Sequence, residues 1–123
     1  MNKKKLVILG ASGQGKVAAD IAKELGVYQQ ILFLDDAENL KECMDLPVVG
    51  KCEIMLDYMN EAEFFVAIGN PAIRRRIVET LMEKEAEIAT LIHPDAVIGT
   101  NVQIGCGTGI MAGAVLNPEC KVG

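Results

Sequence analysis

The chain has 123 residues and a net charge of −5, a length that suits one domain, or one small domain with part of another. Lysine and arginine form no run longer than Lys3–Lys5 or Arg74–Arg76, so neither a nucleic acid nor an anionic membrane surface is expected as a partner. Half of the residues are hydrophobic but only 4% are aromatic, which excludes disorder and favours buried parallel strands made of aliphatic side chains.

The N-terminal apolar run is too short for a secretory signal, so a cytoplasmic location is predicted. The four cysteines form no CxxC pair, and His93 lies near none of them in the sequence. This spacing predicts reduced, mostly buried thiols and no metal site.

Strand and helix signals alternate in the first part of the chain. Apolar runs at residues 5–9, 31–34 and 64–68 predict three buried strands, and a helical apolar period from Val17 to Leu25 ends at Gly26. Residues 37–63 predict a loop, a short strand around 47–49 and a helix around 54–59. This alternation predicts a Rossmann-like, parallel, doubly wound sheet.

A second helix is predicted to begin at Asn70 as N-cap, with Pro71 in its first turn. Four apolar residues at helical spacing predict its buried face: Ile73, Ile77, Leu81 and Met82.

The chain changes character near residue 90. Beyond Glu87 the only charged residues are Asp95, Glu119 and Lys121, which predicts domains at 1–90 and 91–123. An aliphatic residue recurs at every sixth position: Ile92, Ile98, Ile104, Ile110, Leu116 and Val122. Such a period is typical of a parallel β-helix, whose coils need stacked neighbours. The repeats are therefore expected to pack on the first domain or on another chain, or to stay partly mobile.

A membrane helix is the alternative for this uncharged segment. Gly105, Gly109 and Gly113 form a small-residue ladder of the kind that packs such helices. However, polar residues and Pro118 interrupt the segment, and a helix leaves the six regularly spaced aliphatic residues unexplained.

The glycine-rich turn at residues 10–15 includes Ser12, Gly13 and Gln14 and precedes the first helix. Backbone amides at such a turn can bind a phosphate or a nucleotide. The pattern is GxxGxG and not the usual GxGxxG. Asp35 and Asp36 end the second strand, where an acid would contact a ribose. The alternatives are a purely tight turn and a solvated acidic pair.

A P-loop is disfavoured at the same turn. Gly10, Gly15 and Lys16 match its pattern, but Val17 replaces the required Ser or Thr.

Gly69 and Asn70 follow the third strand at the edge where open α/β sheets bind ligands, so they could contact a base or a sugar, or Asn70 could merely cap the helix. One of the arginines at 74–76 could bind phosphate, although most of them should face solvent. His93 is interpreted as structural.

Together these features resemble the hexapeptide-repeat sugar acetyltransferases, namely the sialic acid O-acetyltransferase and bacillosamine-pathway N-acetyltransferase family. The segments that carry the resemblance are 7–15, 33–36, 46–48, 65–70 and 92–94. The resemblance implies that the first domain binds a nucleotide-linked amino sugar, typically a UDP-4-amino sugar. The residues it implies for this contact are Ser12, Gly13, Gln14, Asp35, Asp36 and Gly69. Several relatives carry histidine where this chain has Gln14.

The resemblance also implies a left-handed β-helix that forms a homotrimer, with acetyl-CoA bound between neighbouring helices. The catalytic histidine of the family lies in a repeat beyond Gly123, and His93 does not match it. We therefore expect a truncated chain with no catalytic residue, one that binds the sugar without turnover. The alternatives are a sialic acid O-acetyltransferase, an NAD-binding module and a non-catalytic sensor or assembly subunit. The acceptor stays open between a UDP-amino sugar, GDP-perosamine and a sialic acid.

Overall fold

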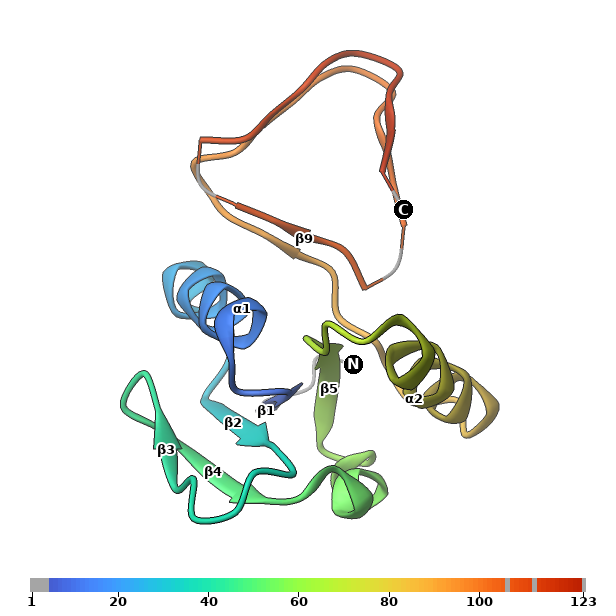
Figure 1. Cartoon of the computed structure of the whole chain (residues 1–123). Helices are drawn as coiled ribbons and strands as arrows, with labels where there is room; N and C mark the ends of the chain where they lie inside the picture. Colours follow the sequence, from blue (N-terminus) through green and yellow to red (C-terminus); the bar gives the residue numbers. More distant parts are fainter. Residues whose placement is uncertain (1–4, 106, 112, 123) are drawn as a thin grey trace.

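The computed structural model describes residues 5–105, 107–111 and 113–122. A five-stranded sheet with the order β3-β4-β2-β1-β5 forms the first part. Helix α1 covers one face of this sheet, and η1 and α2 cover the other (Figure 1). The bounds are β1 Lys5–Leu9, α1 Gly13–Leu25, β2 Gln30–Leu34, β3 Glu42–Cys43, β4 Leu46–Gly50, η1 Cys52–Tyr58, β5 Ala62–Val66 and α2 Pro71–Glu83.

Strand β1 shows why the apolar runs form buried strands. Leu6 and Ile8 belong to the core beneath α1, while Val7 and Leu9 belong to the core beneath η1 and α2. Successive side chains point to opposite faces and both faces are covered, so consecutive residues of the strand must be apolar. β1 pairs in parallel with both β2 and β5, which confirms the parallel core of the predicted sheet.

The sheet departs from the prediction at its edge, where β3 and β4 pair antiparallel. Met44 and Asp45 form the two-residue loop between them with φ values of 54° and 62°, as a type I′ hairpin requires. The sequence lacked the usual Asn-Gly signal for this turn. The predicted parallel sheet therefore holds for β4, β2, β1 and β5 but not for the edge strand β3. The predicted helix around 54–59 is a 3-10 helix over Cys52–Tyr58, and β5 ends at Val66, two residues before the predicted end.

Helix ends follow the sequence closely. Gly26 ends α1 with φ 66°, and Asn70 caps α2 as predicted. The predicted apolar face of α2 is only half right, because Leu81 is fully buried whereas Ile73 is 42% and Met82 65% exposed. Met82 is rotated by about 100° from Leu81 around the helix axis and so points away from the sheet.

The tail, the segment from residue 91 onward, consists of two-residue strands that follow a triangular path (Figure 1). Each strand pairs in parallel with the third strand after it: β6 with β9, β7 with β10 and β8 with β11. The six aliphatic residues of the repeat each end a strand. The bounds are β6 Leu91–Ile92, β7 Val97–Ile98, β8 Gln103–Ile104, β9 Gly109–Ile110, β10 Val115–Leu116 and β11 Lys121–Val122.

This strand pattern leaves no room for the membrane helix considered as an alternative, since the described residues between 96 and 118 form strands and turns. Within the described ranges, no helix is both long and apolar enough to cross a membrane.

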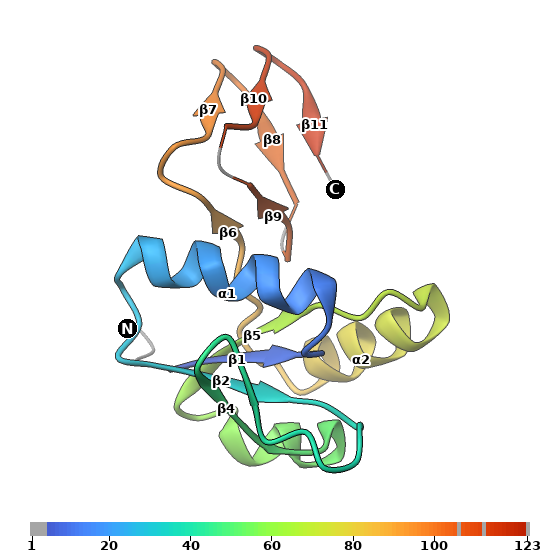
Figure 2. The same cartoon turned by 60° about the vertical axis from the view of Figure 1, so that its left-hand side comes forward.

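The tail packs on the first part through its initial coil, as expected for repeats with open faces (Figure 2). Leu91 is fully buried in the core beneath α1, and Ile88 forms a parallel bridge with Phe64 of β5. Gly109 lies so close to Phe65 that an added Cβ would be 3.1 Å from the ring. This contact places the tail directly above α1 and the end of β5.

Candidate functional site

The candidate site lies at the carboxyl ends of the parallel strands. The glycine turn follows β1, Asp35 and Asp36 follow β2, and Gly69 and Asn70 follow β5. After β1 the chain enters α1 on one face, and after β5 it enters α2 on the other (Figure 2). Open α/β sheets bind ligands where the direction of winding changes in this way.

The glycines of the turn have different roles. Gly10 has φ +107°, and a Cβ there would lie 2.6 Å from the Ala67 carbonyl oxygen. A Cβ at Gly15 would lie 2.0 Å from the Gly10 carbonyl oxygen. The tight-turn interpretation therefore explains Gly10 and Gly15. It does not explain Gly13, whose Cβ would have no atom within 4 Å.

The two helices at this edge differ in how their N-termini are capped. Asn70 Oδ1 accepts hydrogen bonds from the backbone N–H of Ala72 and Ile73, at 3.0 and 3.1 Å, so its capping role is confirmed. Ser12 is the N-cap of α1, and its side chain makes no capping hydrogen bond. The first N–H groups of α1 and the positive end of its dipole are thus left for an anion.

The two acidic residues bind backbone groups of the site itself. Asp35 Oδ2 accepts from the Ala11 N–H at 2.7 Å, and Oδ1 accepts from the Ala37 N–H at 2.8 Å. Asp36 Oδ1 accepts from the Cys52 N–H at 2.9 Å. Asp35 therefore holds the glycine turn in place, which is more than a solvated loop residue does. Each carboxylate retains further acceptor sites, so contact with a nucleoside stays a prediction for both.

Neither Cys52 nor His93 is arranged as a nucleophile or a base. Burial raises the pKa of the Cys52 thiol to about 12, and the nearby charges of Asp36 and Asp35 add to the effect, so the thiol stays protonated at neutral pH. His93 is 7% exposed, and its Nδ1 accepts from the Asp95 N–H at 3.0 Å, which confirms the structural interpretation.

The described cysteines are reduced, as predicted, but they differ in burial. Cys43, Cys52 and Cys120 are free thiols, of which only Cys43 is buried, and Cys106 lies outside the described residues. Among the residues that the structure describes, no group of three His, Cys, Asp or Glu side chains could hold a metal ion.

A cavity of about 700 Å³ opens between the start of α1, α2 and the tail. Gly13 and Gln14 line it, as do Arg74 of α2 and the tail residues Thr108 and Met111. Two predicted site residues thus face one cavity, whereas Ser12, Asp35, Asp36, Gly69 and Asn70 do not line it. This cavity is the main candidate for the ligand site.

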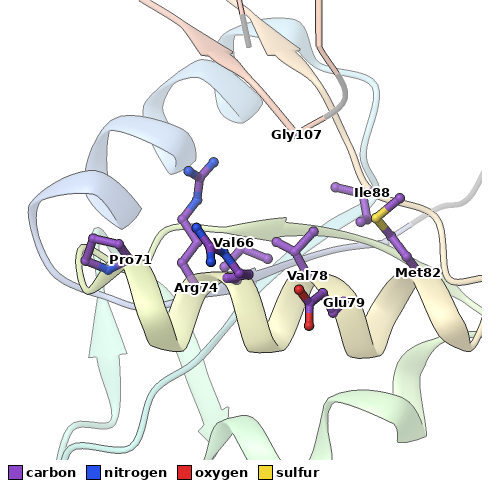
Figure 3. Close-up of a pocket in the computed structure, with 9 residues that line it drawn as sticks. Val66, Pro71, Arg74, Val78, Glu79, Met82, Ile88 and Gly107 are labelled. Carbon is purple, nitrogen blue, oxygen red and sulfur yellow. The ribbon is translucent and has the colours of Figure 1, made fainter.

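The sequence did not reveal the other walls of this cavity. Val17 begins the apolar period that predicted the first helix, yet it is 41% exposed and lines the cavity. Thr108 and Met111 had no signal beyond their place in the repeat. A smaller cavity of about 420 Å³ lies over α2, with Val66, Val78 and Ile88 in its wall (Figure 3), and it contains none of the predicted site residues.

Residues 5–81 match the family model described as the PglD N-terminal domain. The chain belongs to the PglD N-terminal domain family. Among curated proteins, it is 31% identical to UDP-N-acetylbacillosamine N-acetyltransferase of Bacillus subtilis over 89% of the chain and 52% of the relative. It is 27% identical to GDP-perosamine N-acetyltransferase of Escherichia coli O157:H7 over 94% of the chain and 55% of the relative.

The chain is also similar to solved structures of acetyltransferases. The acetyltransferase domain of PglB from Neisseria gonorrhoeae in complex with acetyl coenzyme A is 35% identical, with a TM-score of 0.81 over 99% of this chain and 62% of that chain. PerB from Caulobacter crescentus in complex with CoA and GDP-perosamine is 27% identical, with a TM-score of 0.78 over 95% and 56%. The chain thus spans about half the length of the curated relatives that it matches.

Proposed function

We propose that this chain is the nucleotide-sugar-binding part of an acetyl-CoA-dependent N-acetyltransferase that acts on the amine of a UDP-4-amino sugar. Two curated relatives are N-acetyltransferases of nucleotide-linked amino sugars by name. A solved relative holds both CoA and a nucleotide-linked sugar. These likenesses support a nucleotide-linked amino sugar as acceptor and acetyl-CoA as co-substrate.

One observation carries the binding half of the proposal. The start of α1 has no side-chain cap, Gly13 leaves open space beside it, and both face the 700 Å³ cavity. An anionic ligand could approach the exposed N–H groups there without meeting a side chain. In the proposal the phosphates lie at this turn, the nucleoside lies toward Asp35 and Asp36, and Gly69 and Asn70 border the site.

We further propose that residues 1–90 form the Rossmann-like domain and that residues 91–123 begin a left-handed parallel β-helix. The parallel pairing of β6, β7 and β8 with β9, β10 and β11 supports this assignment. In the full-length protein, such helices would associate as a homotrimer and hold acetyl-CoA between neighbours. The acceptor sugar would then lie where the domain meets the tail.

The proposed chemistry is nucleophilic acyl transfer. The acceptor amine loses a proton to a base, its nitrogen attacks the thioester carbonyl, and the CoA thiolate leaves. The residues described above bind and orient the acceptor. Neither the protonated Cys52 thiol nor the buried His93 suits the role of base, so we expect this chain to bind the sugar without transferring acetyl.

Isothermal titration calorimetry tests the binding half. We expect the chain to bind a UDP-amino sugar, and UDP more tightly than NADH. Gly13→Leu should block the site without a clash inside the protein, because no atom lies within 4 Å of an added Cβ. Asp20→Leu is the matched control, since Asp20 is exposed on the same helix and lines neither cavity.

Absence of heat with millimolar UDP-amino sugar would contradict the proposal. Tighter binding of NADH than of UDP would favour the NAD-binding module instead. Equal losses of affinity for the UDP-amino sugar in Gly13→Leu and Asp20→Leu would show that the glycine turn does not bind the ligand.

A further inference from the structure

We infer that Arg74 is the cation that binds the diphosphate of the nucleotide-linked sugar, an inference that rests on the proposed function. Arg74 lies in the first turns of α2 and lines the 700 Å³ cavity together with Gly13 and Gln14 of α1. Figure 3 shows it near the start of α2, on the side of the helix that faces the tail. The cavity therefore has the uncapped start of α1 in one wall and an arginine in another.

The composition of the cavity wall makes Arg74 distinctive. It is the single charged side chain among the described residues that line this cavity; the others are aliphatic, aromatic, glycine, methionine or neutral polar. No acid lines this cavity; Glu79 lines only the smaller cavity, whose wall also includes Arg74. An anion inside the cavity would thus meet positive potential from Arg74 and from the dipole of α1.

Arg74 is also available to bind. Between described side chains, the ion pairs are Lys5 with Glu61 and Lys51 with Glu38, and neither involves Arg74. A planar guanidinium can donate two parallel hydrogen bonds to a phosphate. A diphosphate offers one phosphate to the amides at the start of α1 and the other to Arg74, whereas a nucleoside offers neither.

The neighbouring arginines provide an internal comparison. Consecutive residues on a helix point about 100° apart, so the three arginines cannot share one environment. Arg74 and Arg75 both line the smaller cavity, where Glu79 is also in the wall, but Arg75 does not line the larger one. Arg76 lines neither cavity. Arg76 therefore matches Arg74 in charge, helix and exposure but not in position.

The test compares Arg74→Gln with Arg76→Gln by calorimetry, using UDP, uridine and inorganic pyrophosphate as probes. Loss of a charge-assisted contact should weaken UDP and pyrophosphate binding by about tenfold or more in Arg74→Gln. Uridine affinity should change by less than about twofold in either variant, well below that tenfold effect. Arg74→Lys keeps the charge without the fork and should have intermediate affinity for UDP.

Melting curves check the fold of each variant, and both arginines are exposed, so equal melting temperatures are expected. If Arg74→Gln melts early, the comparison of Arg74→Lys with Arg76→Gln decides in its place, and unchanged UDP affinity in Arg74→Lys would then overturn the inference. Unchanged UDP affinity in a folded Arg74→Gln variant overturns it as well, while UDP binding by the unmodified chain leaves the proposed function standing. Equal weakening of uridine and UDP overturns it too, because the effect would not involve phosphate. If the unmodified chain binds none of the three probes and no UDP-amino sugar, both proposals fail.

Discussion

Gly15→Ala tests whether the glycine turn is built by close backbone packing. The added Cβ would lie 2.0 Å from the Gly10 carbonyl oxygen and 3.2 Å from Phe33 Cε1. Because the first contact is a backbone atom, no side-chain rotation can relieve it. The start of α1 and the end of β1 must separate by about 1 Å before the contact becomes tolerable.

The expected cost follows from this movement. Overpacking of a tight core usually costs about 1 to 3 kcal/mol, and a backbone clash belongs at or above the upper end. A loss of about 3 kcal/mol is about a fifth to three fifths of a typical domain's stability. At about 4 °C per kcal/mol for a chain of this size, the melting temperature should fall by about 12 °C.

Thermal unfolding followed by circular dichroism measures the effect, with Gly13→Ala as the control. Gly13 occupies the same turn, has open space around it and should accept alanine with no loss, because alanine has the higher helix propensity. If Gly15→Ala melted within about 2 °C of Gly13→Ala, less than 1 kcal/mol would separate them. The close approach of Gly10 and Gly15 would then not hold the turn.

Two further predictions concern the same edge of the sheet. Asn70→Ala should destabilise the fold by about 1 kcal/mol because the N–H groups of Ala72 and Ile73 lose their cap, whereas Asn70→Asp should retain stability; urea denaturation of the two variants measures the difference, and equal losses would exclude a capping role. Cys52 should react slowly with iodoacetamide at pH 8, because its raised pKa leaves little thiolate. Asp36→Asn should increase that rate, which mass spectrometry of the labelled peptide measures. An unchanged rate would contradict the influence of the Asp36 charge on Cys52. The folded Cys52 thiol also holds its proton more tightly than the unfolded one. Its contribution to folding stability is therefore complete below the unfolded pKa and is lost as pH rises from about 8.5 toward 12.

Local sequence was enough to predict the elements whose causes are local. β1 and β2 are continuous apolar runs because both faces of the sheet are covered. Gly26 and Asn70 end and begin helices for reasons that lie within a few residues of each. The antiparallel β3–β4 hairpin was missed because Met44 adopts a positive φ value that a methionine seldom adopts.

The candidate site divides in the same way. The sequence by itself determined that a glycine turn precedes a helix, that acids follow the second strand and that aliphatic residues recur every six positions. Tertiary structure alone decided that Asp35 holds the turn through the Ala11 N–H. It also decided that Val17 and Arg74 line the same cavity as Gly13. A turn or helix cap depends on backbone preferences and nearest neighbours. A cavity depends instead on how α1, α2 and the tail pack, and residues so far apart in the chain have no spacing that would show it.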